Sequence, residues 1–144
     1  MSKGWTALVL VAVATSGCRQ DRPDDAYRAF AKAFAERNAD TAWKLLSSST
    51  RALLTSTAKA TALAEHAKAP KDGRGLMFEG ESLARKVKAV AIIREGDERA
   101  TVEVLDDAGG RAKVAMVRER GKWRVDLTKE LRAVAARIGK PALR

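Results

Sequence analysis

Few residues of this 144-residue chain could carry out chemistry on their own. The chain has one cysteine, Cys18, one histidine, His66, and one tyrosine, Tyr27. A single histidine excludes a histidine-rich metal site and a Ser-His-Asp triad with a histidine to spare. His66 falls near the end of a predicted helix, where its charge would interact favourably with the helix dipole. Cys18 is the one of these three residues whose neighbours in the sequence indicate that it is chemically modified.

Cys18 ends a segment built like a secretory signal. Lys3 precedes an unbroken apolar run, residues 5–14, and the small residues 15–17 lead directly to Cys18. A membrane-spanning helix needs about 20 apolar residues, and this run stops well short of that length. We therefore expect the segment to be removed rather than retained.

Gly17-Cys18 resembles the lipobox of bacterial lipoproteins, although Thr15 stands where that pattern prefers leucine. The resemblance implies that the Cys18 sulfur receives a diacylglyceryl group and that a dedicated signal peptidase removes residues 1–17. Lipid chains on Cys18 would then anchor the protein to a membrane of the bacterial cell envelope, on its periplasmic or extracytoplasmic face. Two alternatives stay open: a short uncleaved anchor, and a secreted protein whose odd cysteine pairs with another chain.

The chain is strongly basic, with 28 lysines and arginines, 18 acidic residues and a net charge of +10. Such a balance favours anionic partners, which in an envelope are phospholipid head groups, lipopolysaccharide phosphates or acidic wall polymers. The alternative is that the charge serves solubility, because the basic residues are scattered without a block of five or six. No nucleic-acid-reading motif is present, so we expect no nucleic-acid partner.

The residues after the signal predict a tether and one domain. Residues 18–25 are mostly polar and suit a short tether, and residues 26–138 have the length of a single domain with a real core. Pro23 fits the first turn of a helix that runs to about Arg37. The apolar residues of this helix recur at spacings of three and four, namely Tyr27, Phe30, Ala31 and Phe34.

Three more helices are predicted. Asp40 would cap a second segment that includes Trp43 and Leu46, and a third helix would run from Arg51 to about Lys68, before Pro70. Thr128 would cap the last helix, with four apolar residues on one side: Leu131, Val134, Ala135 and Ile138. Residues 71–80 hold three glycines and predict a flexible loop that could act as a pocket lid.

Four strands are predicted between the third and last helices. Residues 87–94, 100–104, 112–118 and 123–127 are rich in β-branched residues or alternate apolar with polar side chains. Short turns join them, and residues 106–110 carry the strongest turn signal. Consecutive strands with short connections indicate an antiparallel meander.

Helices first and strands second predict an α+β fold, with N-terminal helices packed on a curved antiparallel sheet and a C-terminal helix. Residues 27–47, and residues 121–127 with a glycine turn before an aromatic strand, resemble parts of nuclear transport factor 2-like domains. The resemblance spans residues 24–127 and implies a cone-like fold that encloses a pocket. Small bacterial lipoproteins of unknown function are its most similar members. The C-terminal helix departs from the pattern and could fill or cap the pocket mouth.

No set of residues predicts catalysis, a cofactor or a metal site. Superfamily members that isomerise steroids or dehydrate small molecules use Asp, Tyr or His inside the cone, and no motif here matches theirs residue by residue. We assign Tyr27 to the apolar stripe, Asp126 to the start of the last helix, and Trp43 and Trp123 to the core. A catalytic site needs several converging groups, and none is assembled by the sequence.

The sequence therefore predicts a membrane-anchored, noncatalytic envelope lipoprotein that binds a small ligand or a protein partner through the cone-like pocket or the sheet face. The alternative is a small isomerase- or dehydratase-like enzyme that uses the same pocket. Such an enzyme requires at least two inward-facing polar groups and a perturbed pKa. A third possibility is a structural module whose pocket is filled by Phe78 or by the final helix.

Overall fold

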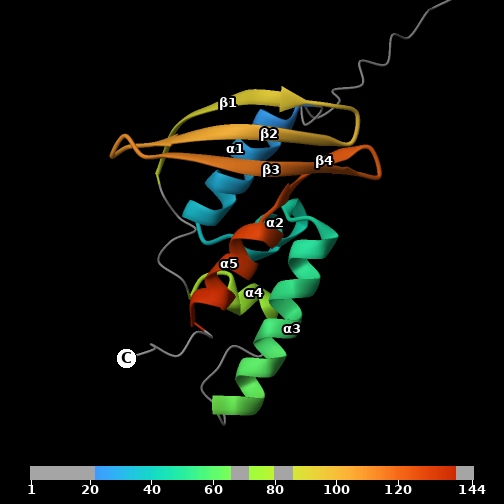
Figure 1. Ribbon diagram of the computed structural model, residues 1–144, viewed down its shortest axis with the longest axis vertical. Coiled ribbons are helices and arrows are strands. Elements are labelled where there is room, and N and C mark those ends of the chain that lie inside the picture. The colour runs from blue at the N-terminus through green and yellow to red at the C-terminus, as the bar shows by residue number, and fades with distance from the viewer. Residues whose placement is uncertain (1–21, 66–71, 80–85, 139–144) are drawn as a thin grey trace, which may run out of the picture.

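The structure is a computed structural model that describes residues 22–65, 72–79 and 86–138. The signal segment, Cys18 and His66 lie outside the described residues. Helices and strands follow one another as α1 (Pro23–Ala35), α2 (Ala39–Leu45), α3 (Ser48–Glu65), α4 (Gly73–Leu76), β1 (Val87–Glu95), β2 (Arg99–Asp106), β3 (Arg111–Glu119), β4 (Lys122–Asp126) and α5 (Thr128–Ile138) (Figure 1). The predicted α+β class is confirmed.

The four strands form one antiparallel sheet in the order β1-β2-β3-β4, so the predicted meander is confirmed. The register of β1 against β2 shifts between Val87 and Ala89 and again between Ile92 and Arg94. Such irregularities bend an edge strand. Along β2 every second residue is buried, which gives the sheet one inner face.

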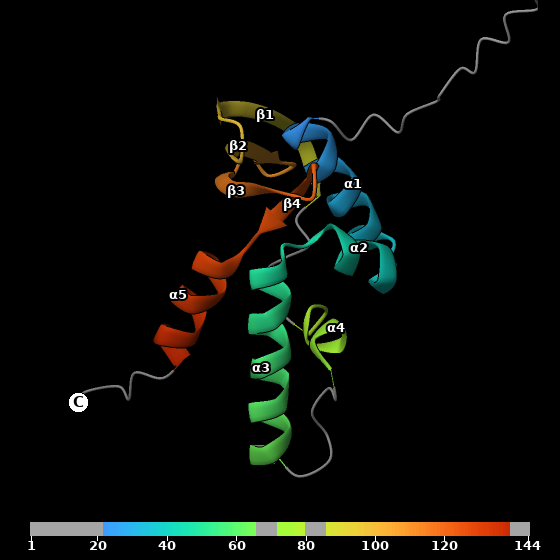
Figure 2. The same cartoon turned by 90° about the vertical axis from the view of Figure 1, so that its right-hand side faces the viewer.

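Helix α1 lies across the inner face of the sheet (Figures 1 and 2). Its buried apolar side chains recur at the helical spacing of three and four residues: Ala26, Phe30, Ala33 and Phe34. Tyr27 and Ala31, which the sequence placed in the buried stripe, are half-buried at its border. Arg28 ties the helix to the sheet, because its Nη2 donates to the carbonyl oxygen of Val90 at 2.9 Å.

The cap of α2 differs from the predicted one, and α3 begins earlier than predicted. The cap of α2 is Asn38, whose Oδ1 accepts a hydrogen bond from the Thr41 amide at 3.2 Å, and Asp40 lies inside the helix. Helix α3 begins at Ser48 rather than at Arg51. Ser47 precedes it, and the Ser47 hydroxyl oxygen accepts from the Thr50 amide at 3.1 Å.

The predicted flexible loop contains helix α4, so that prediction is wrong for Gly73–Leu76. Asp72 Oδ1 accepts from the Gly75 amide at 2.9 Å and starts the helix. Gly73 is required by a close approach of two helices. A Cβ atom there would lie 2.7 Å from the Trp43 ring and 2.8 Å from the Thr55 amide nitrogen.

The residues after α4 pack into the core rather than over a pocket as a lid. Met77 is fully buried. Phe78 stacks on Phe34 of α1, with 4.9 Å between the ring centroids. Phe34 belongs to the buried core, and Phe78 is partly buried against it.

Helices α3 and α5 extend away from the sheet (Figure 2). Helix α3 packs against α4, and α5 contacts α3. In α5, Leu131 is half-buried, whereas Val134 is 48% exposed and Ala135 is exposed. The predicted apolar face of α5 is therefore only partly buried. No helix within the described parts of the chain is long and apolar enough to cross a membrane.

Candidate functional site

A hollow of about 690 Å³ opens beside β4, which is an edge strand of the sheet. We call it the basic hollow. Its lining comes from α1, α2, the start of α3 and the β3–β4 hairpin: Ala29, Thr41, Lys44, Leu45, Ser48, Arg51, Glu119, Arg120, Lys122 and Arg124. Five of these residues are basic and one is acidic.

Helix α2 forms one wall of the basic hollow. Thr41, Lys44 and Leu45 lie three and four residues apart, so they share one face of the helix. Leu45 is buried and fixes this face against the core, whereas Lys44 is exposed and carries its charge at the hollow.

The connection from α2 to α3 is fixed to the edge of the sheet. Leu46 forms an isolated parallel bridge with Val125 of β4. The Ser47 amide donates to the carbonyl oxygen of Val125 at 2.8 Å. Because Ser48 and Arg51 follow immediately at the start of α3, this bridge places both residues at the hollow.

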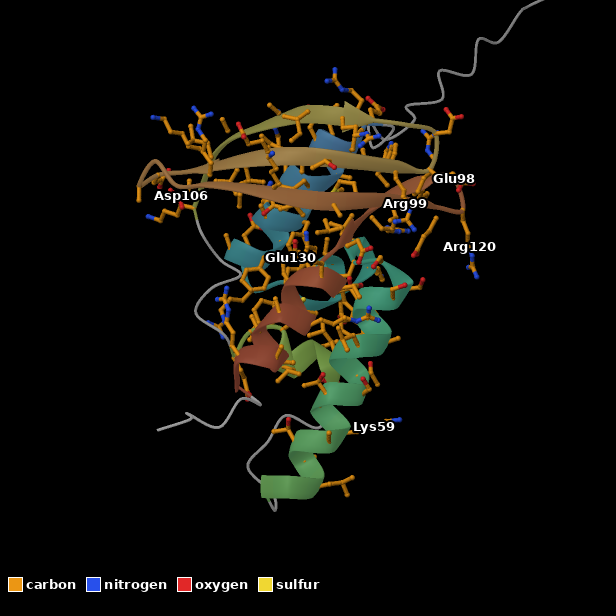
Figure 3. All side chains as sticks on the ribbon, in the orientation of Figure 1. Lys59, Glu98, Arg99, Asp106, Arg120 and Glu130 are labelled. Carbon is orange, nitrogen blue, oxygen red and sulfur yellow. The ribbon has the colours of Figure 1, made fainter. Side chains whose placement is uncertain are left out.

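The opposite wall is the β3–β4 hairpin, whose tip is a two-residue turn. Arg120 and Gly121 both have left-handed backbones, with φ of 51° and 76°, as a type I′ turn requires. Figure 3 shows Arg120 at this tip. Beyond the turn, Trp123 points into the core, so the alternation of the strand turns Lys122 and Arg124 the other way.

A buried polar cluster holds the two walls together. The Ser47 hydroxyl donates to Thr50 Oγ1 at 2.9 Å, and the Thr50 hydroxyl donates to Asp126 Oδ1 at 3.2 Å. Thr50 Oγ1 also accepts from the Leu127 amide at 2.9 Å. The same Asp126 oxygen accepts from the amide of Thr128, at 3.1 Å, and from its hydroxyl.

The hydrogen bonds to Asp126 determine its protonation. Burial alone would raise the pKa of this carboxyl group, but the bonds from Thr128, Thr50 and Ser47 outweigh burial and lower the pKa. Asp126 is therefore an anion that connects α3, β4 and α5. A carboxylate with a lowered pKa and all these donors is a poor general base or acid.

The cations of the basic hollow form no ion pairs with carboxylates of the described residues. Lys44, Arg51, Arg120, Lys122 and Arg124 form no ion pair there. Three arginines outside the hollow are paired with carboxylates: Arg28 with Asp24 at 3.0 Å, Arg74 with Asp40 at 2.7 Å, and Arg111 with Glu103 at 3.4 Å. Other exposed cations of the described residues, such as Arg94 and Arg99, also form no ion pair there, so the hollow differs from them in bringing five cations to one concave place.

Two further observations concern the polar groups of the hollow. The Nε atom of Arg51 is shielded from solvent and has no hydrogen-bond partner in the described part of the chain. Glu119, the one acidic lining residue, directs its Oε1 to Ser48, which donates from its amide at 2.9 Å and from its hydroxyl at 2.8 Å. The arrangement can hold an anion, because donors and cations converge without an equal number of negative charges.

A family model with the description "Domain of unknown function (DUF4878)" matches residues 16–126. The chain belongs to this family. No curated protein and no solved structure matches the chain. Every lining residue of the basic hollow lies inside the matched span of the DUF4878 domain, whereas α5 lies beyond it.

In this DUF4878 domain, the aromatic residues that the sequence analysis discussed, Trp123, Trp43 and Tyr27, pack in or against the core. Trp123 is only 2% exposed, so its assignment to the core is confirmed. Trp43 is half-buried, packs against the core, and has the Arg74 guanidinium 5.9 Å from its ring centroid. Burial raises the pKa of Tyr27, which lies beside Phe30.

The basic hollow itself was missed by sequence reasoning. Its charges come from residues 44, 51 and 120–124, which are far apart in the chain. The one local signal is the alternation of Lys122 and Arg124, which puts two cations on one side of β4, next to Arg120 in the turn. In residues 22–65, 72–79 and 86–138, no group of three or more His, Cys, Asp or Glu side chains could hold a metal ion.

Proposed function

We propose that this chain is a noncatalytic lipoprotein of the bacterial cell envelope that binds a small anionic ligand in the basic hollow. The observation that carries the proposal is the convergence on one hollow of five cations that form no ion pair within residues 22–65, 72–79 and 86–138. Concentrated positive charge in a concave site attracts anions and strengthens their binding. The hollow also has the volume of small-molecule sites, which is about 300 to 1,000 Å³.

Anchoring rests on Cys18. The apolar run, the small residues 15–17 and the single cysteine together resemble a lipoprotein signal, so residues 1–17 would be removed and lipids added to Cys18. Helix α1 begins at Pro23, within the stretch 18–25 proposed as the tether, and this leaves a short connection between lipid and domain. Two or more acyl chains hold a protein firmly to a membrane without a spanning helix.

We also propose the nuclear transport factor 2-like, cone-like arrangement for the domain, residues 26–138. The packing of α1 on the inner face of an antiparallel meander supports it, as does Trp123 on the inner side of β4. In this arrangement the interior is occupied by side chains such as Met116, which is fully buried, and by the Phe34–Phe78 pair. A filled interior favours a ligand site at the surface of the cone.

The surroundings of Asp126 support a noncatalytic role. The isomerase- or dehydratase-like alternative needs two polar groups that face one cavity, and one of them needs a pKa suited to proton transfer. Asp126 has a lowered pKa, and its contacting oxygen is engaged by Ser47, Thr50 and Thr128. Its geometry is that of a structural connector.

Equilibrium binding of two polyanions, tripolyphosphate and citrate, tests the proposal. Calorimetric titration of the full-length chain in detergent should show binding of these anions. The double variant Lys44→Gln/Arg124→Gln removes two cations from opposite walls and should weaken binding at least about tenfold, because hydrogen bonds to charged groups contribute about 1.5–3 kcal/mol each.

The matched control is Lys59→Gln/Arg132→Gln, which removes the same charges from exposed positions on α3 and α5. Figure 3 shows Lys59 on α3, far from the β3–β4 turn. The control should change the affinity by less than about twofold, as expected for distant surface charges screened by salt. Equal losses in both double variants, or no binding of either anion by the wild type, would contradict the proposal.

A further inference from the structure

Glu119 is the single negative charge among the described residues that line the basic hollow. It ends β3, directly before the Arg120–Gly121 turn, and pairs in register with Lys122. Its Oε1 accepts two hydrogen bonds from Ser48, 2.9 Å from the amide nitrogen and 2.8 Å from the hydroxyl oxygen. Glu119 Oε1 therefore already accepts the hydrogen bonds that the amide and hydroxyl of Ser48 could donate to a ligand at the rim of the basic hollow.

The two hydrogen bonds are made by exposed groups. Exposed carboxylate interactions of this kind contribute little to folding and exchange readily with solvent or another acceptor. The carboxylate also lies among cations that have no other counter-ion in the described part of the chain. Glu119 can therefore be replaced by a stronger anion without disturbing the core.

We propose that the basic hollow is a binding site for a phosphate group, and that Glu119 is a built-in competitor that the phosphate displaces from Ser48. This inference rests on the proposed function, because it names the ligand chemistry of the same hollow. The bound phosphate would receive the Ser48 donors and the charges of both walls. Glu119 would lower the affinity, so that the site releases its ligand readily.

The number and type of the cations favour phosphate over a carboxylate. A phosphate monoester carries about 1.5 to 2 negative charges at neutral pH and three strong acceptor oxygens. A single carboxylate would leave most of the charge of the hollow unneutralised. Three of the five cations are arginines, Arg51, Arg120 and Arg124, and a guanidinium can bind phosphate oxygens through two parallel hydrogen bonds.

The phosphate can belong to a soluble phosphate ester or to a phospholipid head group. The four residues after Cys18 reach Arg22 and span at most about 14 Å when extended. A domain anchored at Cys18 would therefore stay close to the head groups of its membrane. Both sources present phosphate oxygens to Lys44, Arg51 and Ser48, as a monoester in the soluble ester and as a singly charged diester in a phosphatidylglycerol head group, and vesicle composition separates them.

The test compares glycerol 3-phosphate with succinate, a dicarboxylate of similar charge, by calorimetric titration of the full-length chain in detergent. The wild type should bind glycerol 3-phosphate about tenfold more tightly than succinate. Glu119→Gln keeps an oxygen that can accept from Ser48 and removes the charge. It should tighten glycerol 3-phosphate binding about fivefold, because a like charge within a few ångströms is removed.

Glu103→Gln is the matched control, because Glu103 is a carboxylate on β2 that pairs with Arg111 outside the hollow. It should leave the affinity for glycerol 3-phosphate within about twofold of the wild type, as expected for a distant, screened charge. Unchanged thermal midpoints for Glu119→Gln would show that its tighter binding is not a change in folding.

The outcomes distinguish this inference from the proposed function. If neither anion binds the wild type, the proposed function itself fails. If both anions bind equally, or if Glu119→Gln binds no more tightly, the hollow is still an anion site but the phosphate inference is overturned.

Reconstitution of the full-length chain into vesicles then shows whether the bound phosphate belongs to a phospholipid or to a soluble ester. If phospholipid head groups fill the hollow, glycerol 3-phosphate binding should be lost in phosphatidylglycerol vesicles and kept in phosphatidylcholine vesicles. If the ligand is a soluble ester, binding should persist in both. Either result supports the phosphate inference and identifies the source of the phosphate.

Discussion

Thr50 Oγ1 and Asp126 Oδ1 lie 3.2 Å apart although 76 residues separate them in the chain. Thr50 belongs to the first turn of α3, and Asp126 is the last residue of β4. Their hydrogen bond joins the helical wall of the basic hollow to its strand wall. The position of Arg51 relative to Arg124 therefore depends on this partly buried contact.

Replacement of Asp126 by asparagine should destabilise the fold by about 2 kcal/mol, the scale of hydrogen bonds to a charged group. The variant keeps the shape of the side chain and loses the negative charge that Thr50, Thr128 and Ser47 stabilise. Urea denaturation at pH 7 measures the loss. Asp107→Asn, at an exposed turn residue, is the control and should change the free energy of unfolding by less than about 0.5 kcal/mol.

The wild type and Asp126→Asn also test how the free energy of unfolding depends on pH. The pKa of Asp126 is lowered in the folded state, so its contribution is fully present above the unfolded pKa of about 3.9 and is lost as the pH falls through the folded value. Between pH 6 and pH 3, the wild type should lose more stability than Asp126→Asn. Parallel curves for the two proteins would show that Asp126 does not contribute in this way.

The order of the elements was accessible from local patterns. Period-two alternation gave the strands, and the three-and-four spacing of Phe30 and Phe34 gave α1, because both faces pack against one core. The residue that caps the start of α2 was harder to predict from the sequence. Asn38 and Asp40 are both good capping residues, and the choice depends on which side chain reaches a free amide in space.

Residues 72–79 and α5 show where local patterns fail. Three glycines predict a loop, yet Gly73 is there because the Trp43 ring and the backbone of α3 leave no room for a Cβ atom. Val134 has the spacing of a buried residue, yet α5 leaves the sheet and keeps it 48% exposed. The basic hollow is a property of tertiary structure, since Lys44 of α2 and Lys122 of β4 both line it although they lie far apart in the chain.

Truncation of Trp123 should strongly destabilise the domain. Its side chain is 2% exposed and belongs to the same core cluster as Phe30 and Phe34. Trp123→Ala should cost about 3–5 kcal/mol, a large part of the roughly 5–15 kcal/mol that keeps a domain folded. Urea denaturation followed by circular dichroism measures the loss without relying on the removed fluorophore.

Arg124→Ala is the control for Trp123→Ala. It truncates the side chain of the neighbouring residue, which points to the opposite side of β4. It should change stability by less than about 1 kcal/mol, as expected for a partly exposed polar side chain without an ion pair. Its effect should be on anion binding instead. Similar small losses for both variants would place Trp123 outside the core and would remove the support that β4 gives to the cone-like arrangement.

Replacement of Cys18 by serine should release the protein from the membrane fraction or leave it unprocessed. Serine has no thiol to receive a diacylglyceryl group, and the remaining apolar run, residues 5–14, is too short for a spanning helix of about 20 residues. Fractionation of cells, with mass spectrometry of the N-terminal peptide, measures both localisation and processing. The wild-type peptide should begin at a lipid-modified Cys18.

Thr15→Leu is the matched control for Cys18→Ser, because it changes the same segment toward the residue that the lipoprotein pattern prefers. It should keep processing and membrane association at the wild-type level or raise them. Acyl chains stabilise membrane binding by about 0.8 kcal/mol for each buried methylene, so loss of the lipid should shift the protein almost completely to the soluble or unprocessed pool. Unchanged partitioning and unchanged processing of Cys18→Ser would overturn the lipoprotein proposal, and anion binding in the basic hollow would then have to be explained without a membrane anchor.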